Sequence, residues 1–209
     1  MEPDAVEIRV VGCLAEKQRT TPDGYPLSLN ALRLACNQST NRDPVVEYDE
    51  ATVSDALRRL ALRGWTRLAS GAGSRARKYR HLLPEALGVD EAELSLLAVL
   101  MLRGTQTPGE LKQRSERLRA FADLAAVDEV LERLIERGLV VRQERRPGQK
   151  EERYSQTLGG EEADAVAAPS SAPASQVEES ADHDRLARLE RELADLRAEV
   201  TALREALGD

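Results

Sequence analysis

The sequence predicts a mainly α-helical protein with two small β-hairpins and a separate C-terminal helix. Aromatic residues make up only 3% of the 209-residue, 23.0 kDa chain, so its cores must be built from Leu, Val and Ala, and this composition favours helices over strands. A helix–helix–helix–hairpin pattern occurs twice along the chain. Apolar residues in a heptad pattern then end the chain and predict a coiled-coil helix.

The first pattern begins with a helix over residues 4–19, where apolar side chains recur at helical spacing. Pro22 disfavours helix at the residue before it, so the helix should end there. Ser28 is the expected N-cap of a second helix, and the polar residues 37–44 form a loop.

A third helix is expected over residues 50–63, with Gly64 as its stop. Strands over residues 65–68 and 75–81 follow, joined by a turn of small residues. Three helices followed by a hairpin are the order of a winged helix-turn-helix domain.

The second pattern repeats this order with a helix over residues 91–103, a short helix opened by Thr107 and Pro108, a helix over 127–137 and a hairpin over 139–154. At an offset of 74 residues the third helices align, with Val53 on Val127, Leu57 on Leu131 and Leu60 on Leu134. A duplicated unit explains this match, and chance similarity of two helix–hairpin units is the alternative.

The tail differs in composition from both patterns. Residues 159–181 are rich in Ala, Ser, Pro and acidic residues, which predicts a disordered linker. The next residues form an uninterrupted a/d seam, namely Leu186, Leu189, Leu193, Leu196, Val200, Leu203 and Leu207. Flanking charges such as Arg185 and Glu190 are opposite in sign across a parallel pair, so we expect a parallel homodimer.

The chain therefore divides into four predicted parts: a first winged-helix domain (1–88), a second (89–158), a linker (159–181) and a coiled coil (182–208). Four segments resemble the YceH family of bacterial proteins: residues 12–17 (GCLAEK), 25–42 (YPLSLNALRLACNQSTNR), 102–111 (LRGTQTPGEL) and 146–154 (RPGQKEERY). The resemblance covers almost the whole chain and implies a tandem winged-helix fold. It implies no function, because that family has no assigned biochemical role.

Several classes of site are excluded by the residue types present. Cys13 and Cys36 lack a CxxC pattern and are expected to be small buried hydrophobes in a reducing compartment. With His81 and His183 they are too few and too far apart for a zinc site. No catalytic triad, phosphate-cradling loop or apolar run of about 18 residues occurs, so we expect a cytoplasmic protein that is not an enzyme and needs no cofactor or membrane.

The net charge of −7 is unevenly distributed. Residues 1–88 contain 13 basic and 11 acidic residues, residues 89–158 contain 12 and 13, and residues 159–209 contain 5 and 13. Because the acidity lies in the tail, the net charge does not exclude nucleic acid as a partner of the first domain.

The first hairpin carries the strongest functional signal. Five cations and no acidic residue lie between Trp65 and Leu82: Arg67, Arg75, Arg77, Lys78 and Arg80. Gly71 and Gly73 would let a phosphate approach the backbone closely. The hypothesis is DNA binding, and the alternative is a solvated edge hairpin whose cations block edge pairing.

The helix predicted over residues 50–63, the third of the first pattern, has an exposed face that suits the major groove of DNA. Its candidate DNA contacts are Thr52, Ser54, Arg58 and Arg59. An ordinary solvated helix face is the alternative. The matching helix of the second domain exposes acidic residues that phosphate would repel, Asp128, Glu129, Glu132 and Glu136. That face is expected to pack against the first domain, a second subunit or a basic protein.

Two polar segments remain. Residues 37–42 carry amides and hydroxyls that could bind a polar ligand, but we expect them to satisfy the loop backbone. Residues 114–119 are locally basic and either join the basic surface or form a solvated helix.

These observations predict a non-enzymatic DNA-binding protein, a transcriptional regulator or chromosome-associated factor that acts as a homodimer. The alternative is a protein-interaction scaffold whose winged-helix domains bind partner proteins without touching DNA. The acidic second domain and the isoelectric point of about 5.1 favour the scaffold. The remoteness of that acidity from the first hairpin favours DNA.

Overall fold

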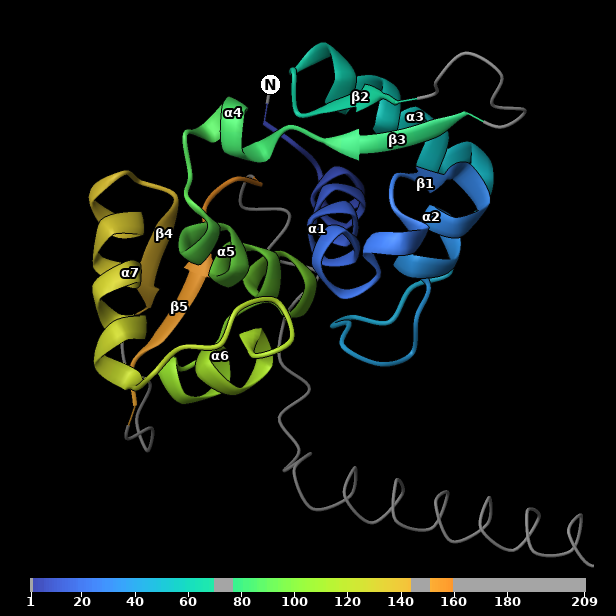
Figure 1. Ribbon diagram of the computed structural model, residues 1–209. Coiled ribbons are helices and arrows are strands. Elements are labelled where there is room, and N and C mark those ends of the chain that lie inside the picture. The colour runs from blue at the N-terminus through green and yellow to red at the C-terminus, as the bar shows by residue number, and fades with distance from the viewer. Residues whose placement is uncertain (1, 70–76, 144–150, 160–209) are drawn as a thin grey trace, which may run out of the picture. The chain divides into compact units, whose positions relative to one another are not determined.

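The computed structural model describes residues 2–69, 77–143 and 151–159. These residues are mainly helical, with a few short antiparallel strand pairs, and the arrangement is consistent with a winged-helix-like fold (Figure 1). Within the described ranges, no helix is long and apolar enough to cross a membrane.

The helices of the first half are α1 (Ala5–Thr20), the one-turn η1 (Pro22–Gly24), α2 (Leu29–Cys36) and α3 (Glu50–Leu62). The three α-helices begin at polar side chains that cap them. Asp4 caps α1 in a capping box with Glu7, the Ser28 hydroxyl accepts the Ala31 amide at 3.2 Å, and Asp49 accepts the Thr52 amide at 2.7 Å. The three predicted helices are confirmed.

The strands of the first half form a sheet of three. Strands β1 (Leu27–Ser28), β2 (Thr66–Leu68) and β3 (Lys78–His81) lie in the order β1-β3-β2, with both pairs antiparallel. Sequence patterns do not predict β1, because a two-residue strand is defined only by its pairing with β3. Helix α4 (Leu83–Leu87) was also unexpected, and it ends at Gly88, which has a φ of +65°.

The second half repeats the order of elements. It contains α5 (Glu91–Arg103), α6 (Pro108–Ser115), α7 (Leu124–Glu136), β4 (Val140–Gln143) and β5 (Arg153–Gln156). Gln106 bridges Tyr154 just before α6, in the place that β1 has before α2. Helix α7 begins at Leu124, earlier than predicted, because the Asp123 carboxylate accepts the Ala126 amide at 2.8 Å.

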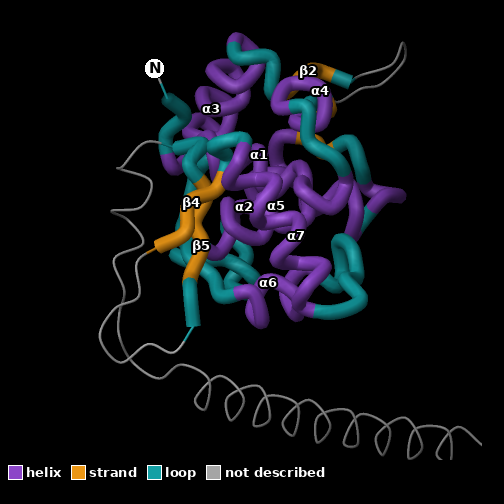
Figure 2. The backbone as a smooth tube through the Cα atoms, turned by 90° about the vertical axis from the view of Figure 1, so that its left-hand side faces the viewer, coloured by secondary structure: helices purple, strands orange, loops and turns teal. Residues whose placement is uncertain are grey.

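The core is continuous through both halves. Helices α1 and α5 pack against each other, as both views show, and each is buried along most of its length (Figures 1 and 2). Gly12 permits this approach, because a Cβ there would lie 3.1 Å from Leu102 Cδ2 and from Met101 Cβ. The two halves therefore share one hydrophobic core instead of burying two separate ones.

Parts of the predicted architecture lie outside the described residues. These are the two hairpin turns, the linker from residue 160 onward and the whole coiled coil over 182–208 with its seven seam residues. The linker, the coiled coil and the division into domains 1–88 and 89–158 stay predictions.

Candidate nucleic-acid interface

The outer face of the first sheet is cationic. Arg67 pairs across the strands with Arg80, and Lys78 lies two residues along β3, so these three side chains belong to one face. Thr66 and His81 pair on the opposite face and are buried. No acidic residue occurs among the described residues of this hairpin, 65–69 and 77–82. The surface defined by Arg67, Lys78 and Arg80 is called the basic face below.

Arg67 and Arg80 are like charges placed directly opposite each other, which is unfavourable in an antiparallel pair. Neither guanidinium makes a hydrogen bond or ion pair with another described residue. The Nε atom of Arg80 is buried without a hydrogen-bond partner among those residues. An anion placed on this face would relieve the repulsion and satisfy the donors.

The structure argues against edge protection as the reason for the cations on β3. This strand is paired with β2 on one side and with β1 at Lys78 and Tyr79 on the other, so Lys78 does not lie on an exposed edge. Arg77 is exposed just before β3, whereas Arg75 lies in the part of the hairpin that is not described.

Helix α3 presents some, but not all, of its predicted contacts. Ser54 and Arg58 are exposed, and Arg58 Nη2 lies 3.1 Å from Asp55 Oδ1. Thr52 is half-buried beside the capping carboxylate of Asp49. Arg59, also predicted to contact DNA, pairs in this structure with Asp4 and Glu7 at the start of α1.

Arg59 and Arg63 together hold the Glu7 carboxylate. Arg59 Nε lies 3.2 Å from Glu7 Oε2, Arg63 Nε lies 3.1 Å from Glu7 Oε1, and Arg59 also reaches Asp4 at 2.7 Å. Burial raises the pKa of Glu7, but the Asp4 amide and the two guanidinium groups outweigh it and hold the pKa below its ordinary value. This cluster ties α3 to the N-terminus of α1.

The second half repeats the same cluster. Arg133 of α7 and Arg137, the C-cap of that helix, hold Glu93, the capping-box residue of α5, at 3.5 Å and 2.8 Å. Arg133 also pairs with Asp90 at 3.2 Å. The arginines follow the 74-residue offset found in the sequence, so the two halves share ion-pair chemistry as well as apolar pattern.

The exposed face of α7 is acidic, as predicted. Its exposed carboxylates are Asp128, Glu129, Glu132 and Glu136. Glu132 is bonded to Arg142 on β4. This face would repel phosphate. It lies on α7, the counterpart of α3, whereas the basic face lies on β2 and β3.

The loop after α2 is held by its own polar side chains, as expected. Asn37 brackets Tyr48, donating to its carbonyl at 2.8 Å and accepting its amide at 2.9 Å. Arg42 is buried, donating to the Ala35 carbonyl at 3.0 Å and to Glu16 Oε2 at 2.6 Å. The structural interpretation of this loop is confirmed for Asn37 and Arg42.

The cysteines and the described histidine are internal. Cys13 and Cys36 are free, buried thiols. His81 is 4% exposed, with Nε2 2.7 Å from Gln18 Oε1 and Nδ1 accepting the Leu83 amide at 3.3 Å. Burial lowers the pKa of His81 to about 4. The neutral imidazole therefore links β3 to α1.

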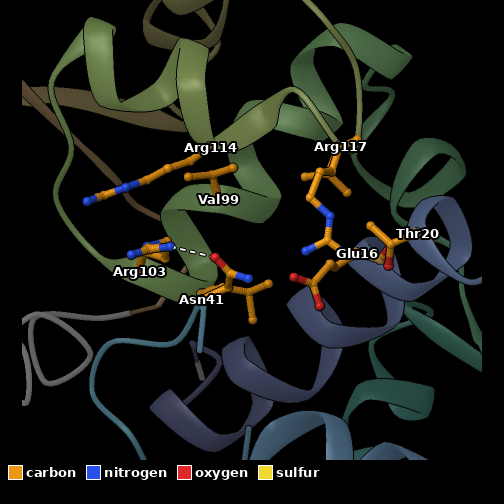
Figure 3. A pocket seen from close by; sticks show the side chains of 9 residues that line it. Glu16, Thr20, Asn41, Val99, Arg103, Arg114 and Arg117 are labelled. Atoms are coloured by element: carbon orange, nitrogen blue, oxygen red, sulfur yellow. Dashed lines mark hydrogen bonds between the residues drawn. The ribbon is translucent and has the colours of Figure 1, made fainter. Parts of the chain in front are cut away.

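One polar site was missed by sequence reasoning. Glu16, Asn41, Arg103 and Arg117 meet at a pocket where α1 faces α5 (Figure 3). Three of these residues belong to the segments that resemble a known family, and Arg117 belongs to the basic segment 114–119. No local pattern could bring them together, because the contact between Arg103 and Asn41 spans 62 residues.

Known proteins similar to this chain cover nearly its full length. A 49% identical UPF0502 protein of Pelobacter propionicus aligns over 206 residues, 97% of this chain and 94% of its own. UPF0502 proteins of Solibacter usitatus and Geobacter sulfurreducens are 46% and 48% identical, over 93% and 91% of this chain and 92% and 88% of their own. Residues 4–149 match the family model described as a protein of unknown function, DUF480. The chain therefore belongs to the DUF480 family of proteins of unknown function.

Proposed function

We propose that this protein is a non-enzymatic DNA-binding factor whose first hairpin contacts phosphate. The observation that carries the proposal is that Arg67 on β2 lies directly opposite Arg80 on β3. Both are positively charged, and neither guanidinium makes a hydrogen bond or ion pair with another described residue. Such a pair costs stability in the free protein and is relieved when a phosphate oxygen accepts from both guanidinium groups.

Two neighbouring features support DNA over a free anion. Helix α3 packs against β2, so Ser54 and Arg58 are carried on an element next to the basic face. In a winged helix-turn-helix domain, the third helix enters the major groove while the wing lies along the backbone. The resemblance to the YceH family implies the same tandem winged-helix fold.

A homodimer completes the proposal. The predicted coiled coil over residues 182–208 would join two chains in parallel and so present two first domains to one duplex. The long linker would let the two domains reach separate half-sites. The role that follows is regulation of transcription or association with the chromosome.

The direct test removes the paired charges. The variant R67Q/R80Q should lose most of its affinity for a DNA duplex in fluorescence anisotropy at low salt, and it should be at least as stable as the wild type, because the repulsion is gone. The charge-matched control K112Q/R119Q changes two cations of the second half and should bind DNA as the wild type does. If R67Q/R80Q binds DNA normally, the basic face is not the contact surface.

A protein-binding scaffold is the second candidate. The acidic face of α7 favours it, as do two exposed leucines at the end of α3 and on β2, Leu62 at 86% and Leu68 at 52% exposure. Winged-helix domains can bind proteins through such surfaces. A wild-type protein that shows no salt-sensitive binding to duplex DNA would make this the better proposal.

A further inference from the structure

An open pocket lies between elements of the two halves. Its apolar side is formed by Val99 and Leu102 of α5 and by Leu118 in the turn after α6. Its polar residues come from α1, from the loop after α2, from the end of α5 and from the same turn: Glu16, Asn41, Arg103 and Arg117 (Figure 3). The pocket therefore depends on both halves of the chain.

Asn41 presents a donor to this pocket. Its φ of +58° places it in the left-handed region, which Asn tolerates better than most residues. Its Oδ1 accepts from Arg103 Nη1 at 2.8 Å, and the Asp43 amide donates to the Leu102 carbonyl at 2.9 Å, which fixes the loop on α5. Its Nδ2 has no hydrogen-bond partner among the described residues and lies on the side that faces Arg117 in Figure 3.

Arg117 presents a charge to the same space. The amides of Leu118 and Arg119 both donate to the Ser115 carbonyl at 2.8 Å, which closes the turn that carries Arg117. Its guanidinium makes no hydrogen bond or ion pair with another described residue, and Figure 3 shows it pointing into the pocket. Arg114, by contrast, turns away and bonds Gln106 and Glu110.

Glu16 does not require Arg117 as its counter-ion. Its carboxylate is held by the fully buried side chain of Arg42 at 2.6 Å and by Lys17 at 3.6 Å. Burial raises the pKa of Glu16, but the hydrogen bond and charge of Arg42 and the charge of Lys17 outweigh it, so the pKa is lowered. Arg42 and Lys17 thus neutralise the acid of the pocket, and the charge of Arg117 is left without an ion pair to another described residue.

We propose that this pocket binds a small organic anion, a carboxylate or a phosphate monoester that carries an apolar group. The anionic oxygens accept from the Arg117 guanidinium and the Asn41 amide, and the charge of Arg103 lies beside them. The apolar group packs on Val99, Leu102 and Leu118. Because the ligand contacts elements of both halves, its binding should stabilise the packing of the two halves against each other. The inference does not depend on DNA binding.

The test uses the full-length protein carrying R67Q/R80Q, so that the basic face cannot capture the probes. The probes are phenyl phosphate, benzoate and the neutral benzyl alcohol. Their binding is measured by isothermal titration calorimetry at low salt. We expect saturable, one-to-one binding of one or both anions and no measurable binding of benzyl alcohol. The comparison of phenyl phosphate with benzoate identifies which oxyanion the pocket takes.

Two variants locate the binding. R117A should weaken the binding of the preferred anion roughly tenfold or more, since it removes charged hydrogen bonds, and N41D should weaken it by a similar factor. The control R119A changes a cation two residues away, whose guanidinium lies 5.8 Å from the Phe121 ring, and should bind as the parent does. Melting temperatures of all variants should match the parent, because Arg117 is exposed.

Three results would overturn the proposal. They are no saturable binding of either anion, equal binding of benzyl alcohol, and equal losses in R117A and R119A. None of them bears on DNA binding, which is measured separately with the basic face intact.

Discussion

Arg63 Nε lies 3.1 Å from Glu7 Oε1, and the equivalent Arg137 Nη1 lies 2.8 Å from Glu93 Oε2. In each half, an arginine near the end of the third helix holds the glutamate that closes the capping box of the first helix. The glutamates are almost fully buried, whereas the arginines are partly exposed. The same ion pair therefore ties the third helix to the first helix in each half of the protein.

Replacing Glu7 with Gln should destabilise the protein by about 1 to 3 kcal/mol, because a near-isosteric amide leaves Arg59 and Arg63 without their buried counter-charge. The figure lies below that of a fully buried pair, since both arginines contact solvent. Urea unfolding near neutral pH measures the change. E50Q, which alters an exposed glutamate in the first turn of α3, is the control and should unfold like the wild type. A Glu7 variant as stable as E50Q would show that the cluster adds nothing.

Stability should fall as the pH drops from about 6.5 toward about 4, because His81 is buried and neutral in the folded state. Its pKa is depressed in the fold, so the unfolded chain binds the proton more readily and gains population in acid. The expected loss between about pH 7.5 and pH 5 is about 2 kcal/mol. Urea titrations of the wild type and of H81Q at both pH values measure it, and the two should differ in their pH dependence. The prediction is wrong if H81Q loses as much stability in acid as the wild type.

DNA binding should be steeply dependent on salt and should be carried by the first hairpin. Each cation that neutralises a phosphate adds about 0.9 to the slope of log affinity against log salt, so three engaged cations in each chain of a dimer give a slope of roughly 5. Replacing Arg75, Arg77 and Lys78 together with Ala should lower that slope, between about 50 and 200 mM salt, by about 0.9 for each of them that engages a phosphate. An unchanged slope in this triple variant would move the contact surface elsewhere.

Removing residues 182–209 should leave a folded monomer, because the predicted seam of Leu186, Leu196 and their neighbours joins the chains. Light scattering of the full and shortened chains gives the two masses. Changing Arg197 and Arg204 to Glu in the full chain should weaken the dimer by a few tenths of a kcal/mol for each lost pair. A shortened chain that still runs as a dimer would place the interface in residues 1–181.

Gly12→Val should destabilise the protein by about 2 kcal/mol or more, although valine is the better helix former. Even a single Cβ would lie 3.1 Å from Leu102 and Met101, and a branched side chain would separate α1 from α5. Thermal unfolding detects the change. The exposed Gly24 has no neighbour within 4 Å of a Cβ, so G24A serves as the control and should melt near the wild type. Wild-type stability in G12V would mean that the two helices do not need this close approach.

The sequence predicted the helices best where a cap and an apolar period coincide, as at Asp4, Ser28 and Thr107. It missed β1 and α4, because these are too short to show a period and exist through contacts with β3 and α5. The candidate site was predicted in part. The predicted strand over residues 75–81 is confirmed by β3, whose alternation puts Lys78 and Arg80 on one face.

Other parts of the site could not be predicted, because they depend on partners far along the chain. Arg59 was assigned to DNA from its helix face, but Asp4, which binds it, lies 55 residues away. Asn41 was expected to satisfy the backbone of its own loop, but its side chain accepts a hydrogen bond from Arg103, 62 residues away. Charge and periodicity describe neighbours on one element, whereas these two contacts arise from tertiary packing.

The continuous core also sets the order in which parts of the protein can fold during synthesis. Helix α1 emerges from the ribosome first, yet its packing partner α5 ends only at Arg103. Until then the apolar residues of α1 that α5 covers remain open to water and to other nascent chains. We therefore expect the first half to expose an apolar face that chaperones can bind until α5 has emerged and packed on α1.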